Sequence, residues 1–160
     1  MLKHAGVIVL LALLSGCGFT LRGTAQLPEA MQPLYVDVTN TTAMTRELVR
    51  VFSDNHTALA PDAGSARYRL DVAGETSNER AISVNATARA GEYELTMGVQ
   101  FQLRRGAEVV LGPQALSTSK VYLADPENAV AKNEEAELIR TEMRKELAQQ
   151  ILRRLQAVKL

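Results

Sequence analysis

The feature that most constrains the fold is a two-residue alternation in the middle of the chain. Apolar side chains occupy every second position from residue 93 to residue 103, and mostly polar side chains lie between them. This period predicts a β-strand with one buried face and one face that meets water or a hydrophilic partner. Residues 34–38, 67–72 and 116–123 predict further strands. We expect irregular backbone at residues 74–78, before alternation resumes at residues 82–88, and a break at Gly112-Pro113.

Two segments show helical spacing instead. Residues 42–55 predict one helix, with Asn40, Thr41 and Thr42 as capping candidates. Asp125-Pro126 predicts the start of a longer helix that ends near residue 156 and is roughly 45 Å long. Its apolar residues recur every four positions: Ile139, Met143, Leu147, Ile151 and Leu155. The order β-α-β-β-β-α predicts an α+β two-layer sandwich, with two helices packed on one face of a four-stranded sheet.

The N-terminus carries a targeting pattern. An uncharged, mostly apolar run follows Lys3 and extends to residue 14, which is too short for a spanning helix of about 20 residues but typical of a signal peptide. The sequence Leu-Ser-Gly-Cys that ends at Cys17 resembles the lipobox of bacterial lipoproteins. We therefore expect residues 1–16 to be a signal peptide, residues 17–33 to be a lipidated cysteine with an extended tether, and residues 34–160 to be a single α+β domain. The alternative is an ordinary signal peptide followed by a chance cysteine.

The lipobox resemblance implies acyl chains on Cys17, which is the only cysteine in the chain. Several acyl chains hold a protein on a membrane without a transmembrane helix. In enteric bacteria an aspartate after the cysteine favours retention at the inner membrane. The residue here is Gly18, which favours the outer membrane.

Composition argues against several functions. The chain has 18 basic and 18 acidic side chains, so it is not a bulk binder of polyanions, and export argues against nucleic acid as a partner. Removal of the leader leaves His56 as the single histidine, and no cluster has the spacing of a metal site. We expect a protein that is not an enzyme and has no cofactor. A hydrolase, the weakest alternative, would have to rely on His56 and scattered serines.

Basic residues are the candidate ligand-binding groups, because arginine forks and lysine ammonium groups both suit phosphate. Each of them, taken singly, is also compatible with an ordinary surface charge. The residues that we place at sheet ends, on the polar sheet face or near the last helix are Arg80, Arg89, Arg104, Arg105, Lys120 and Lys132.

Three blocks together resemble the LPS-assembly lipoproteins, the LptE family, and their order covers essentially the whole mature chain. The blocks are residues 18–24 (GFTLRGT), residues 90–97 (AGEYELTM) and residues 125–135 (DPENAVAKNEE). The resemblance implies a lipoprotein of the outer membrane that lies, on the periplasmic side, inside the lumen of the β-barrel protein LptD. There it would act as a plug, help the barrel to assemble and take part in moving lipopolysaccharide to the outer leaflet.

The resemblance also implies binding of lipopolysaccharide, whose phosphates require basic residues. Arg89 and Lys132 are the first candidates because they lie within or beside the matched blocks, and Arg80, Arg104 and Arg105 are secondary candidates. Whether any of them contacts the barrel instead of the ligand stays open. The main alternative function is a structural lipoprotein of another cell-envelope assembly complex, because the same anchor and fold would serve it.

Overall fold

The computed structural model describes residues 26–37, 42–84, 90–123 and 128–160, which form one four-stranded sheet and two α-helices. The strands are β1 (Leu34–Val36), β2 (Tyr68–Val84), β3 (Ala90–Arg105) and β4 (Glu108–Leu123), and they lie side by side in that order. The helices are α2 (Ala43–Asp54) and α3 (Ala129–Gln156), and a short 3-10 helix, η1 (Glu29–Met31), precedes β1. The predicted α+β class and the β-α-β-β-β-α order are confirmed.

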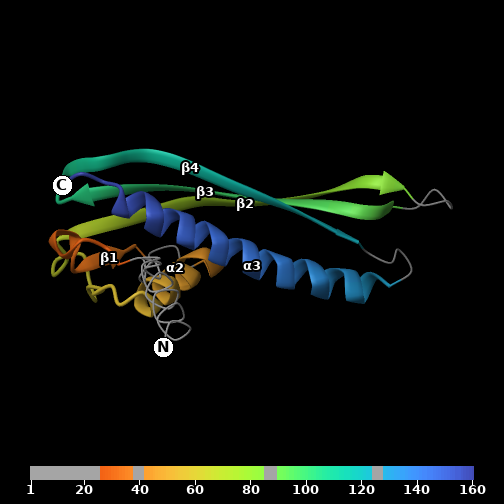
Figure 1. Cartoon of the computed structure of the whole chain (residues 1–160), viewed down its shortest axis with the longest axis horizontal. Coiled ribbons are helices and arrows are strands. Elements are labelled where there is room, and N and C mark those ends of the chain that lie inside the picture. Colours follow the sequence, from red (N-terminus) through yellow and green to blue (C-terminus); the bar gives the residue numbers. More distant parts are fainter. Residues whose placement is uncertain (1–25, 38–41, 85–89, 124–127) are drawn as a thin grey trace, which may run out of the picture.

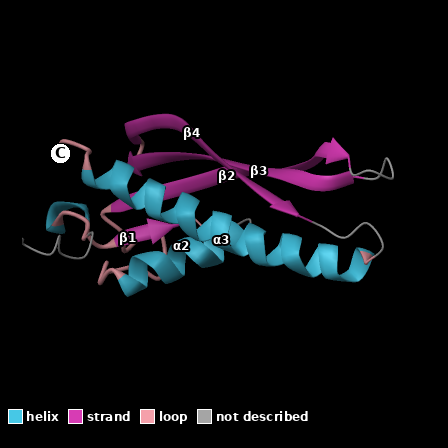
Figure 2. Cartoon of the chain, turned by 45° about the vertical axis from the view of Figure 1, so that its right-hand side comes forward, coloured by secondary structure: helices cyan, strands magenta, loops and turns pink. Residues whose placement is uncertain are grey.

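The sheet is a long twisted ribbon with both helices on one side (Figures 1 and 2). β1 pairs in parallel with the first residues of β2, and α2 supplies the crossover that a parallel pair requires. β2, β3 and β4 then follow as an antiparallel meander. We call the end that carries β1 and α2 the proximal end. The opposite end, where β2 and β4 finish and α3 begins, is the distal end.

The apolar core lies mainly at the proximal end, between the sheet and both helices. Leu48 and Phe52 of α2 and Leu147 and Ile151 of α3 are fully buried there, together with Leu103 of β3. The predicted apolar stripe of the last helix therefore covers the helix-facing side of the sheet, except that Ile139 is only partly buried. Every apolar residue of β3 from Leu95 to Leu103 that faces the helices is at most 2% exposed.

Both helices begin with a side-chain cap. Thr42 and Thr45 form a reciprocal capping box at the start of α2, in which each backbone N–H donates to the other hydroxyl. Asn40 and Thr41 lie outside the described residues. The predicted start of the last helix at Asp125-Pro126 is wrong, because Asn128 is the cap and accepts a hydrogen bond from the Ala131 N–H at 3.0 Å. Residues 124–127 are outside the described ranges.

The expected breaks in two strands are instead irregularities within continuous strands. β2 runs through residues 74–78 because Gly74, with φ of 66°, takes up a shift in register between Ala73 and Thr76. β4 likewise continues past Pro113. Proline has no N–H to donate, but β4 is an edge strand and the register shifts at this point, so the proline is tolerated.

The predicted extended tether at residues 17–33 is wrong for its described end. Leu27 is 3% exposed and Met31 is fully buried in the core, so the packed domain begins before β1. Gln156 at the end of α3 donates a side-chain hydrogen bond to the Gln26 carbonyl at 2.9 Å. Proline and glycine content suggested a linker, but two well-spaced apolar side chains are enough to bring this segment into the core.

Candidate functional site

The two faces of the sheet differ sharply in chemistry. The face under the helices is apolar, whereas neither of the described α-helices covers the other face, which we call the outer face (Figure 2). Hydroxyl and amide side chains line the outer face, and Thr96 of β3 and Ser119 of β4 hydrogen bond to each other there at 3.0 Å. This arrangement is the one that the alternation of residues 93–103 predicts, and it leaves a largely hydrophilic surface in which Val109, Val121 and Leu123 of β4 are exposed apolar side chains.

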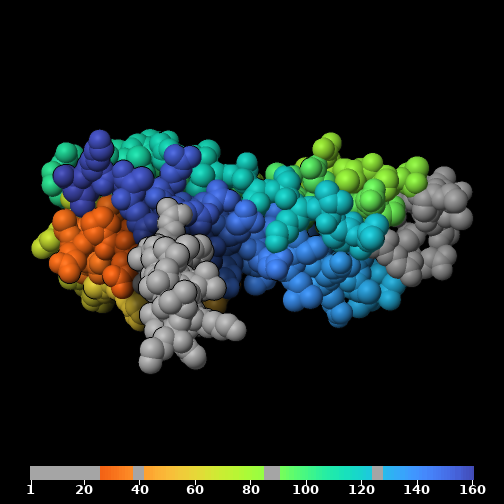
Figure 3. Space-filling view, viewed as in Figure 1, coloured from red at the N-terminus to blue at the C-terminus, as the bar shows by residue number. Residues whose placement is uncertain are grey.

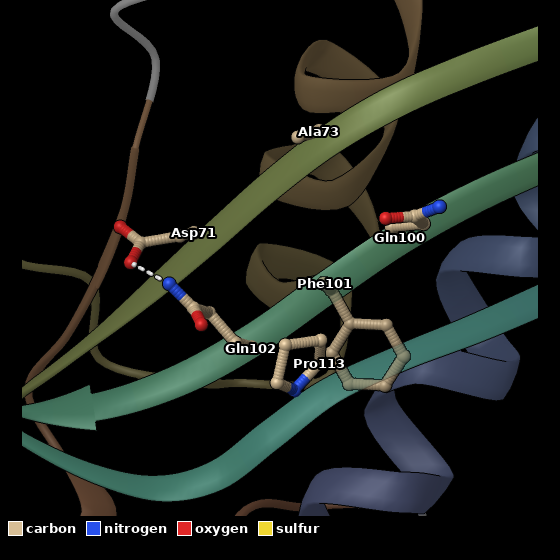
Figure 4. Close-up of a pocket in the computed structure, with 6 residues that line it drawn as sticks. All are labelled: Asp71, Ala73, Gln100, Phe101, Gln102 and Pro113. Carbon is tan, nitrogen blue, oxygen red and sulfur yellow. Dashed lines mark hydrogen bonds between the residues drawn. The ribbon is translucent and has the colours of Figure 1, made fainter.

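A small pocket of about 160 Å³ lies where β4 bends around Pro113 (Figure 4). Asp71, Ala73 and Gln100 line it together with Phe101, Gln102 and Pro113. Two of its polar groups already bond each other, since Gln102 donates to Asp71 at 3.1 Å. The pocket therefore presents no free nucleophile or acid.

The charged groups of the helix-facing side gather toward the distal end, where α3 meets β2. The Lys132 ammonium lies 2.6 Å from one oxygen of Glu79, and Arg140 lies 3.2 Å from the other. Arg144, one turn further along α3, bonds Glu75 at 2.8 Å. The distal half of α3 is thus held on the sheet largely by ion pairs, whereas the proximal half is held by apolar contacts.

Two tyrosines form the floor of this charged cluster. Tyr93 of β3 and Tyr122 of β4 are paired across the strands, and their rings stack with centroids 5.6 Å apart. The Lys132 ammonium sits 3.7 Å above the Tyr93 ring centre, which is a cation–π contact. We call the set of Glu79, Tyr93, Tyr122, Lys132 and Arg140 the distal cluster.

The electrostatics of the distal cluster are those of a carboxylate held among positive groups. Burial alone would raise the pKa of Glu79, but the bond from Lys132 and the nearby Tyr122 hydroxyl, with the charges of Lys132 and Arg140, outweigh burial and lower that pKa. Burial first, and then the neighbouring Glu79 carboxylate, raise the pKa of Tyr122 to about 12. Glu79 is therefore ionised and Tyr122 is neutral at neutral pH.

The basic residues singled out from the sequence do not form one patch. Each described candidate pairs with a carboxylate: Arg80 with Glu94, Arg104 with Asp71, Arg105 with Glu108, and Lys132 with Glu79. The Arg80–Glu94 pair lies near one end of β3 and Arg104 near the other. Positions 94 and 104 are ten residues apart, or about 33 Å at 3.3 Å per residue, so these basic residues cannot bind one phosphate together. Arg89 lies outside the described residues. Lys120, also noted from the sequence, pairs with Glu142 on α3 at 2.5 Å.

Sequence reasoning missed Glu79, Arg140 and Tyr122. Glu79 lies directly opposite the buried Leu95, so it points to the helix-facing side of the sheet. A charged residue at an inward strand position is a signal of a paired or functional group. That signal is hidden here, because the irregularity at Gly74 shifts the inward positions from even to odd numbers along β2.

His56 is the one histidine among the described residues. His56 follows the end of α2 with φ of 57°, a turn position. Within residues 26–37, 42–84, 90–123 and 128–160, no group of three potential metal ligands comes together. Among the helices of those same ranges, none is long and apolar enough to cross a membrane.

Comparison with known proteins identifies the family. A family model described as LptE, lipopolysaccharide-assembly, matches residues 31–155. The chain is 31% identical to the LPS-assembly lipoprotein LptE of Yersinia enterocolitica over 166 residues, which cover 98% of this chain and 78% of that protein. The corresponding protein of Yersinia pestis is 30% identical over 164 residues, with the same coverage.

Solved structures agree in fold. Lipoprotein B from Nitrosomonas europaea superposes with a TM-score of 0.72 at 24% identity, over 88% of this chain and 91% of that one. Rare lipoprotein B from Shewanella oneidensis gives 0.64 at 25% identity, over 76% and 90%. With the family model matching most of the chain and with curated relatives along nearly its whole length, this chain belongs to the LptE family of LPS-assembly lipoproteins.

Proposed function

We propose that this protein is a non-catalytic lipoprotein of lipopolysaccharide assembly, anchored to the outer membrane through acylated Cys17. In this role it plugs the lumen of the LptD β-barrel from the periplasmic side and helps the barrel to assemble. The observation that carries the proposal is the uncovered, largely hydrophilic outer face, joined to membership of a family whose curated relatives are named for lipopolysaccharide assembly. A plug in a water-filled lumen needs a polar surface of this kind.

The shape of the protein supports the same role. The ribbon and α3 run side by side from the proximal to the distal end, giving an elongated body (Figures 1 and 3). α3 alone has 28 residues and spans roughly 42 Å, comparable with the full thickness of a bilayer. Ion pairs of its distal half, such as Lys132 with Glu79 and Arg144 with Glu75, supply charged groups whose charges are balanced by a partner.

Depletion distinguishes this proposal from a structural role in another envelope complex. Loss of surface lipopolysaccharide and of folded LptD, with other outer-membrane barrels intact, is the expected result. Simultaneous loss of all barrels would instead assign the protein to general barrel assembly. Site-specific photocrosslinkers at Gln100 on the outer face and at Leu160 near the end of the chain would then show which surface meets the barrel.

We further propose that lipopolysaccharide phosphates bind to the basic residues Arg89 and Lys132, with Arg80, Arg104 and Arg105 as secondary contacts. Since every described member of this set is paired with a carboxylate, a phosphate has to replace an internal partner. Arg80 and Arg105 have side chains that are 67% and 56% exposed and can exchange most readily. The Arg89→Glu, Lys132→Glu double variant should bind lipopolysaccharide more weakly while its circular dichroism spectrum is retained. Unchanged affinity would remove these two residues from the binding site.

A further inference from the structure

The Glu79 carboxylate occupies a position that is built to hold an anion. Lys132 and Arg140 approach its two oxygens at 2.6 Å and 3.2 Å. The buried Tyr122 hydroxyl lies beside it but makes no well-aligned hydrogen bond among the described residues. Two cations and one hydroxyl therefore converge on a single carboxylate, and they do so from α3 and β4, two elements that are far from β2 in sequence.

Among its partly buried groups, this position carries more positive than negative charge. Lys132 and Arg140 together offer two positive charges to the one negative charge of Glu79. Arg140 has a second partner, Glu137, at 2.6 Å, but that carboxylate is 65% exposed and its attraction is weakened by water. A phosphate monoester carries between one and two negative charges near neutral pH and has three acceptor oxygens, so it matches these donors better than a carboxylate does.

The position is also reachable and preorganised. The side chains of Lys132, Glu79 and Arg140 are 23%, 22% and 21% exposed, so an edge of the cluster opens to solvent. The Tyr93 ring beneath the Lys132 ammonium holds that charge in place without help from Glu79. Displacement of Glu79 would leave the donors where they are, with an opening at their centre.

We propose that Glu79 is a built-in competitor for ligand phosphate, and that Lys132, Arg140 and Tyr122 form the phosphate site when the Glu79 side chain turns away. The ligand, a phosphate of lipopolysaccharide, is taken from the proposed function, and the inference rests on that function to this extent. It adds Arg140 and Tyr122 as phosphate donors and gives Glu79 the role of keeping the site closed in the absence of ligand.

The test measures equilibrium binding of fluorescently labelled lipopolysaccharide to the full-length lipidated protein in detergent. Glu79→Gln keeps the shape of the side chain and removes its charge, and it should tighten binding about tenfold, the change that corresponds to 1.4 kcal/mol. Adding Arg140→Met to Glu79→Gln should abolish the gain. The matched control is Glu75→Gln, because Glu75 lies on the same strand, is 18% exposed and pairs with Arg144 of α3. Its affinity should equal that of the wild type.

Parallel titrations identify the source of the phosphate. Enzymatically dephosphorylated lipopolysaccharide should show no gain from Glu79→Gln, and inorganic phosphate should bind the variant more weakly than intact lipopolysaccharide does. A gain that persists with the dephosphorylated ligand would overturn the proposal. So would a gain seen only with inorganic phosphate, because the ligand would then not be a lipid.

The outcomes separate the two proposals. Saturable wild-type binding with no tightening in Glu79→Gln refutes the competitor role and leaves the proposed function standing. Binding by Glu79→Gln but not by the wild type supports the competitor role, and absence of binding in both refutes both proposals. If Glu79→Gln does not fold, Glu79→Asp replaces it: the shorter carboxylate should reach Lys132 and Arg140 less well, so binding should again be tighter than in the wild type.

Discussion

Replacing one leucine of α3 tests whether the helix is anchored where the structure places its core. Leu147 of α3 is fully buried in the apolar core. Leu138 on the same helix is 72% exposed. Leu147→Ala removes buried methyl groups and leaves a cavity, and such changes cost between about 2.7 and 5.0 kcal/mol. We expect a loss near 3 kcal/mol. For a domain of this size that loss lowers the melting temperature by about 6–12 °C.

The assay is urea and thermal denaturation of the two variants, followed by circular dichroism. Leu138→Ala is the matched control, because it makes the same chemical change on the same helix at an exposed site. Its stability should stay within about 0.5 kcal/mol of the wild type. The reasoning is refuted if both variants lose similar stability, or if Leu147→Ala loses less than about 1 kcal/mol, since either result would mean that α3 does not cover the sheet as described.

Three further predictions concern local features. Thr42→Ala removes the hydroxyl that caps α2 and should cost about 1 kcal/mol in urea denaturation; no loss would exclude the capping box. Gly98→Ala places a Cβ 2.8 Å from the Thr76 hydroxyl and should destabilise by about 1–3 kcal/mol, and Thr76→Ala should recover part of the loss in a double-mutant cycle. The pKa of Tyr122 is raised from 10.0 to about 12, so its contribution to stability is complete below pH 10 and is lost as the pH rises from 10 to about 12. Phenolate absorbance should show this late titration, and Tyr122→Phe should remove the matching fall in the free energy of unfolding with pH.

The long-range pattern of the chain could be predicted where its periodicity is unbroken. The alternation in β3 and the four-residue repeat in α3 both appear in the structure with the expected buried faces. The bulge at Gly74 was not predictable in the same way, because an inserted register shift exchanges the two faces of a strand without changing its composition. The same limitation hid the inward position of Glu79.

The candidate site was predictable only in part, for a related reason. A single sequence shows which residues can bind phosphate, but it does not show which carboxylates neutralise them. Lys132 and Glu79 are 53 positions apart in the chain, and their contact depends on the strand register of β2 and on where α3 begins. The predicted helix start also differs from the observed one, because Asp125-Pro126 and Asn128 are both acceptable caps by composition, and the bond from the Ala131 N–H that marks Asn128 as the cap cannot be read from the sequence.

The most direct test of the account is to purify the tagged full-length protein from outer membranes in mild detergent and identify its tightest partner. The account predicts one large β-barrel, LptD, at equal stoichiometry, bound to a protein whose N-terminus is acylated Cys17. Recovery of the protein alone, with a different envelope complex, or with residues 1–16 still attached would contradict it.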